Sequence, residues 1–208
     1  ALKSGMSQWY QQKYQPYAQS LNPNLTLPYD QWVNNASQET LLLQHYYLQT
    51  NELSPDKLST IVDRADGSVY GQQHKKYHQS FLEVSQRYQL QELYLVETKN
   101  LNVVYSVAKS PVFATSLKEG AFANTELATT VKNVLAKPTQ QWLVSAPSAF
   151  PGYFQQQVLF MGHTQVQHYY PSWWRYVSTR RPPAPGDSTH FYCIRHIYSS
   201  RPDLCIWQ

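Results

Sequence analysis

The alternation of apolar and polar positions is most regular at residues 92–109. Two short apolar runs, at 92–97 and 102–109, flank a polar corner at Lys99-Asn100. This pattern predicts an antiparallel hairpin. Successive side chains of a strand point to opposite faces, and large apolar residues occupy both odd and even positions of the two runs. We therefore expect other parts of the chain to cover both faces of the hairpin.

Apolar residues at helical spacing dominate the sequence before the hairpin. They predict helices at 1–20, 30–50 and 69–89, with Asp30 as the cap of the second helix and a short helical turn after Ser54-Pro55. The third helix is expected to bury one stripe of large side chains at helical spacing. The members of this stripe are Tyr70, Tyr77, Phe81, Val84 and Tyr88.

The sequence after the hairpin predicts one helix and two further strands. The helix is expected at 125–136 and the strands at 140–145 and 156–162, with a bend containing proline and glycine at 147–152. The fold class that follows is α+β, with long amino-terminal helices packed on a small antiparallel sheet and an irregular carboxy-terminal tail. We divide the chain into an amino-terminal helical region (1–65), a core (66–162) and a tail (163–208).

Composition narrows the class of protein only a little. The chain has 208 residues, of which 42% are hydrophobic and 14% charged, which suits one domain with a proper core and excludes a charge-rich disordered chain. The net charge of +4 is too small to indicate nucleic acid. No window approaches the roughly 18 to 20 apolar residues that cross a bilayer, and the first residues do not resemble a signal peptide. We therefore expect a mature or excised segment.

The tail differs from the rest of the chain in composition. It has five arginines and no lysine, three of the six tryptophans, and both cysteines, Cys193 and Cys205. Cations mixed with aromatic residues are typical of single-strand nucleic-acid binders, but the proline-containing segment 182–185 favours an irregular appendage, and we expect no nucleic-acid partner. In an oxidising compartment the two cysteines could close a small loop.

Six short motifs follow one another in the core. They are Asp66-Gly67-Ser68-x-Tyr70, His74-x-x-Tyr77-His78-x-x-Phe81, Glu92-Leu93-Tyr94-Leu95-Val96-Glu97, Val103-Val104-Tyr105-Ser106-Val107-x-Lys109, Phe113-Ala114-Thr115-Ser116-Leu117 and Gly120-x-Phe122-x-x-Thr125-x-Leu127-Ala128. In this order they resemble extracytoplasmic sensor domains of the Cache type, found in bacterial methyl-accepting chemotaxis proteins, sensor kinases and membrane-bound nucleotide cyclases. The resemblance implies a PAS-like sheet preceded by a long amino-terminal helix.

The chain departs from this family at three places. The family usually has paired aromatics before the first strand, where this chain has Leu90-Gln91, and acidic residues after the lysine of the second strand, where it has Ser110 and Val112. Beyond residue 162 the family has a glycine-turn hairpin, a closing strand rich in valine and leucine, and a transmembrane helix. The tail has none of these sequences, and our hypothesis is that it is the out-of-frame end of a truncated gene. Closing strands encoded in an adjacent frame would support it.

The resemblance points to a ligand pocket between the sheet and its covering helices. Lys109 ends an apolar strand and would point a cation into this space to bind a carboxylate or an amino acid; the alternative is a side chain that reaches solvent at the strand end. Tyr94 and Tyr105 offer an aromatic face and a hydroxyl, although packing alone also explains tyrosines in a sheet. Arg87 and Phe122 are weaker candidates for the same pocket.

The sequence gives no comparable case for a metal site or for catalysis. His74 and His78 are four residues apart on a predicted helix, close enough to bind one metal ion. Lys75 stands where a zinc protease has glutamate, and no third ligand is spaced nearby. We expect one histidine to pack and the other to face water, with no metal and no cofactor. A nucleophile elbow and a phosphate-binding glycine loop are also absent from the sequence.

The function expected from these features is non-enzymatic ligand sensing outside the cytoplasm. The chain would be the periplasmic domain of an inner-membrane receptor, binding a small molecule and relaying through its amino-terminal helix. Its membrane contact would come only through segments absent from this sequence, and the amino-terminal helices would pair two copies. The alternatives are a stand-alone structural or protein-interaction domain without a pocket and a metal-dependent hydrolase that uses His74 and His78.

Overall fold

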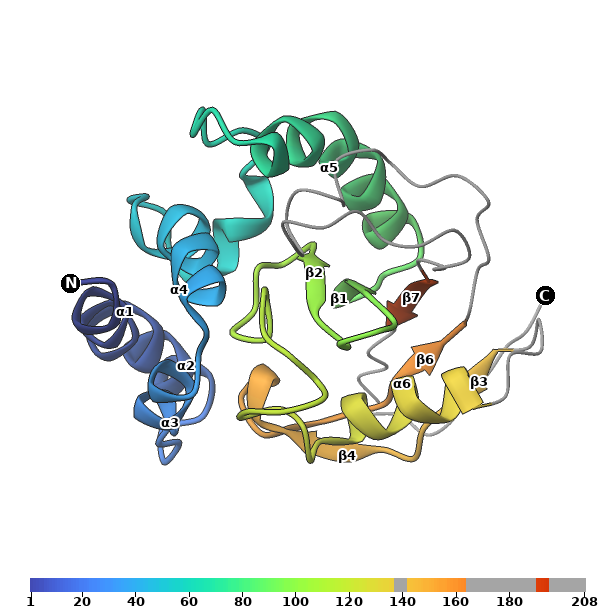
Figure 1. Ribbon diagram of the computed structural model, residues 1–208. Helices are drawn as coiled ribbons and strands as arrows, with labels where there is room; N and C mark the ends of the chain where they lie inside the picture. The colour runs from blue at the N-terminus through green and yellow to red at the C-terminus, as the bar shows by residue number, and fades with distance from the viewer. Residues whose placement is uncertain (137–141, 164–189, 195–208) are drawn as a thin grey trace.

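A computed structural model describes residues 1–136, 142–163 and 190–194 of the chain. Its centre is an antiparallel sheet in the order β2-β1-β7, formed by β2 (Val103–Ser106), β1 (Glu92–Val96) and β7 (His190–Ile194). Figure 1 shows α5 (Val69–Arg87) over one face of this sheet, α6 (Glu126–Ala136) with the short strands beyond the other, and the amino-terminal helices at its side.

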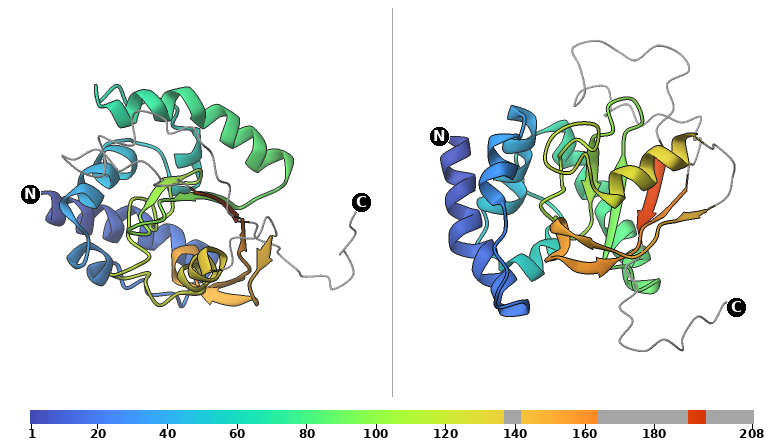
Figure 2. Two further views of the ribbon diagram at one scale, coloured as in Figure 1. Left: turned by 45° about the vertical axis from the view of Figure 1, so that its right-hand side comes forward. Right: turned by 90° about the horizontal axis from the view of Figure 1, so that it is seen from below.

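The first predicted helix continues through Pro16 to the end of α2. It comprises α1 (Leu2–Trp9), the π-helical turn η1 (Tyr10–Tyr14) and α2 (Gln15–Leu21). Pro16 directly follows the π-helical turn, at the junction with α2, where the hydrogen-bonding pattern of the helix changes. The two views in Figure 2 show this rod along one side of the molecule.

The second predicted helix is interrupted. It is divided into α3 (Tyr29–Asn34), α4 (Gln38–Gln44) and the π-helical turn η2 (His45–Gln49). Ser37 has extended backbone angles, and its hydroxyl accepts a hydrogen bond from Thr40 N, so it starts a new helix. Asp30 lies inside the first turn of α3 and is not the cap. The expectation of one helix from 30 to 50 was therefore wrong.

The third predicted helix is confirmed as α5, but its buried stripe is not the one expected. The turn after Ser54 forms η3 (Pro55–Thr60), and Ser68 then caps α5 through a bond from Gly71 N. The buried residues of α5 are Tyr70, Gly71, His74, His78 and Ser85. Tyr77, Val84 and Tyr88 are exposed, because the helix turns its histidines rather than these apolar residues toward the sheet.

The hairpin is confirmed, and every residue of β1 and β2 is buried. Tyr94 pairs with Ser106 and Leu95 with Tyr105, and a bulge then shifts the register so that Val96 pairs with Val103. Tyr94 and Val96 pack in the main core, whereas Leu95 and Tyr105 pack under α5. Both faces are therefore covered, as the alternation predicted.

The strands between α6 and the tail are short, the one expected at 156–162 is divided in two, and a further strand lies in the bend expected at 147–152. β3 (Leu143–Val144) pairs with β6 (Met161–Gly162), and β4 (Ser148–Phe150) pairs with β5 (Gln156–Val158) around the turn η4 (Pro151–Tyr153). The predicted helix at 125–136 is confirmed as α6. β7 lies within the tail, so the expectation of an irregular tail was wrong for 190–194; Cys205 lies outside the described residues.

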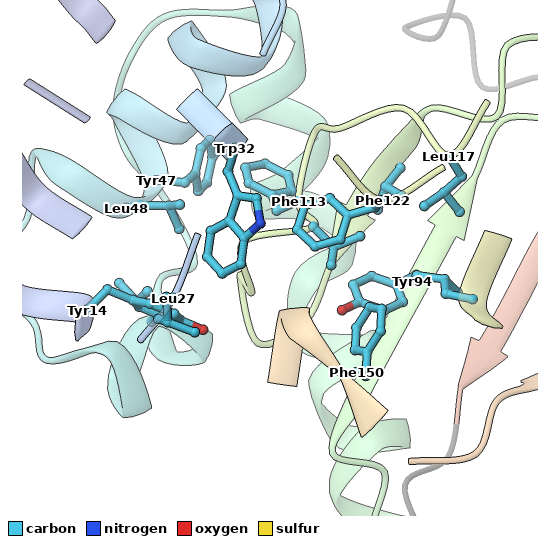
Figure 3. Close-up of a cluster of buried hydrophobic side chains, with 14 of the residues drawn as sticks. Tyr14, Leu27, Trp32, Tyr47, Leu48, Tyr94, Phe113, Leu117, Phe122 and Phe150 are labelled. Atoms are coloured by element: carbon cyan, nitrogen blue, oxygen red, sulfur yellow. The ribbon is translucent and has the colours of Figure 1, made fainter. Parts of the chain in front are cut away.

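A single aromatic-rich core joins the amino-terminal helices to the sheet and to the segment around α6. Figure 3 shows Trp32 and Tyr47 from the helical side facing Phe113, Phe122 and Tyr94. The rings of Trp32 and Phe122 are 5.6 Å apart. The α+β class is thus confirmed. Among the described residues no helix is long and apolar enough to cross a membrane.

The pairing of β7 with β1 gives a first testable prediction. Val107 N donates to Leu93 O, so the backbone groups of Leu93 face β2. Along a strand these groups point alternately to the two neighbouring strands, so those of Tyr94 face β7, where Tyr94 pairs with Tyr192. Tyr192→Pro removes an N–H from this ladder and is expected to lower the free energy of unfolding by about 1–3 kcal/mol. Urea denaturation of the full chain measures this loss. Tyr192→Thr, which keeps the N–H, is the matched control; equal stability of the two variants would contradict the pairing.

Candidate functional site around Lys109

The end of β2 places a lysine side chain inside the protein. Lys109 follows the strand in the left-handed backbone region, with φ 58°, and this turn directs the chain back toward the core. Its side chain is only 1% exposed. Nζ donates to the carbonyl oxygens of Ser106 at 2.7 Å and Val107 at 3.5 Å. The alternative of a lysine that reaches solvent was therefore wrong.

Aromatic rings form much of the surroundings of Nζ. The ring centroid of Tyr105 is 4.9 Å away and that of Tyr47 6.0 Å away, close enough for cation–π attraction to a charged amine. No carboxylate of the described residues lies within ion-pair distance of Lys109. Burial lowers the pKa of Lys109 to about 7, and the nearby carboxylate of Glu92 opposes this shift.

Glu92 is the buried acid of the site and joins the two strands at their open end. Its Oε1 accepts bonds from the backbone N–H groups of Leu93 and Ala108, both at 2.9 Å, and its Oε2 accepts one from the Ser106 hydroxyl at 2.7 Å. Burial raises the pKa of Glu92, while these bonds and Lys109 favour the charged form. The Tyr94 hydroxyl is a further hydrogen-bonding neighbour of this carboxylate, so its roughly four acceptor positions are in use.

A hydrogen-bonded chain connects Tyr105 to α5 and to η3. His78 Nε2 lies 2.7 Å from the carbonyl oxygen of Ser59, and Nδ1 lies 2.7 Å from the Tyr105 hydroxyl. A carbonyl oxygen can only accept, so Nε2 carries the proton, and Nδ1 accepts from the hydroxyl. Because Tyr105 donates to His78 and His78 donates to Ser59, the ring is the neutral tautomer with its proton on Nε2. Burial lowers the pKa of His78 to about 4.

His74 is stacked on His78, with ring centroids 4.5 Å apart. Its Nδ1 donates to the Val62 carbonyl oxygen, whereas the buried Nε2 has no hydrogen-bond partner among the described residues. Burial lowers the pKa of His74 to about 2, with Lys109 adding to the shift. Both histidines are buried, so the expectation that one faces water was wrong. Among 1–136, 142–163 and 190–194, no group of three acidic, histidine or cysteine residues is placed to hold a metal.

The two predicted tyrosines lie on opposite faces of the hairpin. Tyr105 contacts Lys109 directly under α5. Tyr94 points into the main core, where its hydroxyl and that of Ser110 are 2.6 Å apart. Ser110 follows Lys109 in the chain, and its N–H donates to the Ser106 hydroxyl. Tyr94 therefore approaches the site from the main-core face, through Ser110 and the side chain of Glu92, rather than by sharing a face with Tyr105.

A cavity of about 390 Å³ opens beside these groups. Glu92, Lys109 and Ser110 line it at the hairpin end, and Tyr14 and Tyr17 line it from the amino-terminal helix. Figure 3 shows Tyr14 and Tyr94 among the buried side chains of the main core. The cavity therefore combines charged and hydroxyl groups with aromatic walls, a composition suited to a small polar ligand.

The other two candidate residues lie elsewhere. Phe122 lines a separate cavity of about 590 Å³, with Trp32 and Tyr70. Arg87 is exposed at the end of α5 and lines neither cavity. Of the five predicted site residues, Lys109 lines the 390 Å³ cavity and Phe122 the 590 Å³ cavity, whereas Tyr94, Tyr105 and Arg87 line neither. Sequence reasoning did not single out Glu92 as a site residue; its position opposite the end of the second apolar run was the available signal.

Comparison with known proteins identifies no relative. No protein-family model matches the chain, and searches of curated proteins and of solved structures find no match either.

The neutral histidines predict a loss of stability in acid. In the unfolded chain His78 binds a proton as the pH falls below about 6.5, but in the folded protein only near pH 4. Stability is therefore present above pH 6.5 and lost from 6.5 to 4, by up to about 1.4 kcal/mol per pH unit. His74 extends the loss toward pH 2.

Urea unfolding at several pH values measures this loss. His78→Gln keeps a donor for Ser59 and an acceptor for Tyr105 but cannot titrate, so the slope between pH 6.5 and 4 should decrease. His45→Gln, on η2 outside this network, controls for the removal of one histidine. An unchanged slope in His78→Gln would refute the assignment of a neutral buried His78.

Proposed function

We propose that this chain is the extracytoplasmic ligand-binding domain of a bacterial signalling receptor, and that its ligand is a small carboxylate or amino acid bound beside Lys109. One observation supports the proposal most directly. A fully buried lysine borders a 390 Å³ cavity and has no carboxylate within ion-pair distance among the described residues. Keeping an amine out of water costs free energy, and an acidic ligand would recover part of that cost.

The chemistry of the cavity fits this ligand class. A ligand carboxylate next to Lys109 would favour the charged amine and form a charge-assisted hydrogen bond. The negative charge of Glu92, which also lines the cavity, would attract a ligand ammonium group and so suit an amino acid. The rings of Tyr14, Tyr17 and Phe154, which also line the cavity, offer apolar contact to the rest of the molecule.

The connection of the cavity to the amino-terminal helix supports a role in signalling. Tyr14 and Tyr17 lie on η1 and α2 and line the same cavity as Lys109. A ligand that binds one packing of this helix better than another shifts the balance between them. In the proposed receptor that shift would pass to membrane and output segments outside this sequence. The amino-terminal helices also remain our proposed dimer contact. The proposed activity is binding, without catalysis and without a cofactor.

Thermal melting of the full chain with a panel of small carboxylates and amino acids tests the proposal. A ligand that binds only the folded state adds about 2.7 kcal/mol of stability at a hundredfold excess over Kd. Lys109→Met should abolish the shift. Lys75→Met, which removes an exposed lysine paired with Asp63, is the control and should keep it. A protein that melts cooperatively but shifts with no member of the panel would refute the proposal.

The pH dependence of the same binding follows from Lys109. Below about pH 7 the amine is already charged, whereas above pH 7 carboxylate binding must be accompanied by uptake of a proton. The affinity for a carboxylate should therefore fall by up to about tenfold per pH unit above 7. Titration calorimetry in buffers of different ionisation enthalpy measures the proton uptake. Affinity that is constant from pH 6 to pH 9 would contradict this role of Lys109.

A further inference from the structure

We propose that Lys109 carries a neutral amine and captures small carbonyl compounds, aldehydes or α-keto acids, as a Schiff base in the 390 Å³ cavity. This inference rests on the proposed function because it uses the same binding cavity. It adds a covalent step and names a narrower class of ligand, in which the reacting group is a carbonyl carbon.

The hydrogen bonds of Nζ carry the argument. A neutral amine has two N–H donors and one lone pair, whereas an ammonium group has three donors. The described residues offer Nζ two acceptors, the carbonyl oxygens of Ser106 and Val107. These two acceptors match the two N–H groups of the neutral amine, and the remaining position on the nitrogen is its lone pair. For the third buried donor of an ammonium group the described residues offer only the rings of Tyr47 and Tyr105 and no oxygen acceptor, which is costly.

The burial of Nζ favours the neutral amine more than its neighbours favour the charged one. The groups that face it are Glu92 from β1, Tyr105 from β2, His74 and His78 from α5, and Tyr47 from η2. In this set Glu92 and the rings of Tyr47 and Tyr105 attract a positive charge. Both histidines are neutral, and desolvation lowers the pKa of Lys109 to about 7. A desolvated lysine with a pKa near neutrality is the form that attacks carbonyl carbons.

The step balances with groups present at the site. The Nζ lone pair forms a bond to the carbonyl carbon, the C=O π bond breaks, and one N–H proton moves to the oxygen to give a carbinolamine. A second proton assists departure of the hydroxyl as water, and the C=N bond forms with loss of the remaining N–H proton. Hydroxyl groups that can carry these protons belong to Tyr105, which is bonded to His78, and to Ser110, which is bonded to Tyr94. The step needs no oxidant or reductant.

Pyruvate and lactate form a matched pair of probes, because both have a carboxylate and only pyruvate has a ketone. The full chain is incubated at pH 7 with each probe and sodium cyanoborohydride, which reduces a Schiff base to a stable amine, and the modified lysines are identified by peptide mass spectrometry. We expect pyruvate to modify Lys109 at least about tenfold faster than the exposed Lys75, because an ordinary lysine is almost fully protonated at this pH. Lactate should leave no adduct.

The controls separate this inference from the proposed function. Lys109→Met should lose the adduct, and Lys75→Met should keep it; if Lys109→Met fails to fold, the position of the adduct in the unaltered chain still decides. Trapping should increase as the pH rises through 7, opposite to the affinity for a plain carboxylate. Equal thermal shifts with pyruvate and lactate, without an adduct at Lys109, would overturn the covalent step and leave the binding proposal standing. No shift and no adduct would overturn both.

Discussion

Three hydrogen bonds to the carboxylate of Glu92 hold the open end of the hairpin, and the candidate site depends on them. The carboxylate binds its own strand through Leu93 N and the other strand through Ala108 N and the Ser106 hydroxyl. Because these groups are buried, leaving one of them without a hydrogen-bond partner would cost more free energy than a typical hydrogen bond contributes to stability. With the strands fixed here, the chain turns sharply at the next residue, Lys109, and its side chain enters the interior.

The same interior tolerates many polar groups because most are neutral and bonded to the backbone. His74 and His78 donate to the carbonyl oxygens of Val62 and Ser59, and Lys109 donates to those of Ser106 and Val107. These bonds tie α5 to the segment that contains η3, and β2 to the turn that follows it. A neutral imidazole can donate to a carbonyl oxygen without carrying a charge, so the two histidines avoid the cost of burying ions. This explains how a site rich in basic side chains can lie in a protein core.

The sequence predicted the elements that follow from local apolar patterns. It did not predict the helix boundary and the buried side chains that depend on tertiary contacts. The hairpin, α5 and α6 follow from apolar spacing, and the burial of both hairpin faces follows from alternation. The division of the second helix at Ser37 depends on one capping hydroxyl that a 21-residue apolar pattern hides. The burial of His74 and His78 instead of Tyr77 depends on carbonyl oxygens of residues 59 and 62, whose positions helical periodicity cannot give. Lys109 was placed between sheet and helices because it ends an apolar strand, but its partners come from a backbone turn that the sequence did not indicate.

The placement of Tyr14 explains how the site could be coupled to the amino-terminal helix. This residue lies on the π-helical turn between α1 and α2, packs against Phe154 with ring centroids 5.6 Å apart, and lines the cavity beside Lys109. A π-helical turn has one extra residue relative to the α-helical repeat and is frequently found at functional sites. Its neighbours Tyr10 and Trp9 are packed in the main core with Trp32. A ligand that displaces Tyr14 would therefore act on a rigid aromatic cluster, and such clusters change between discrete packings rather than deform continuously.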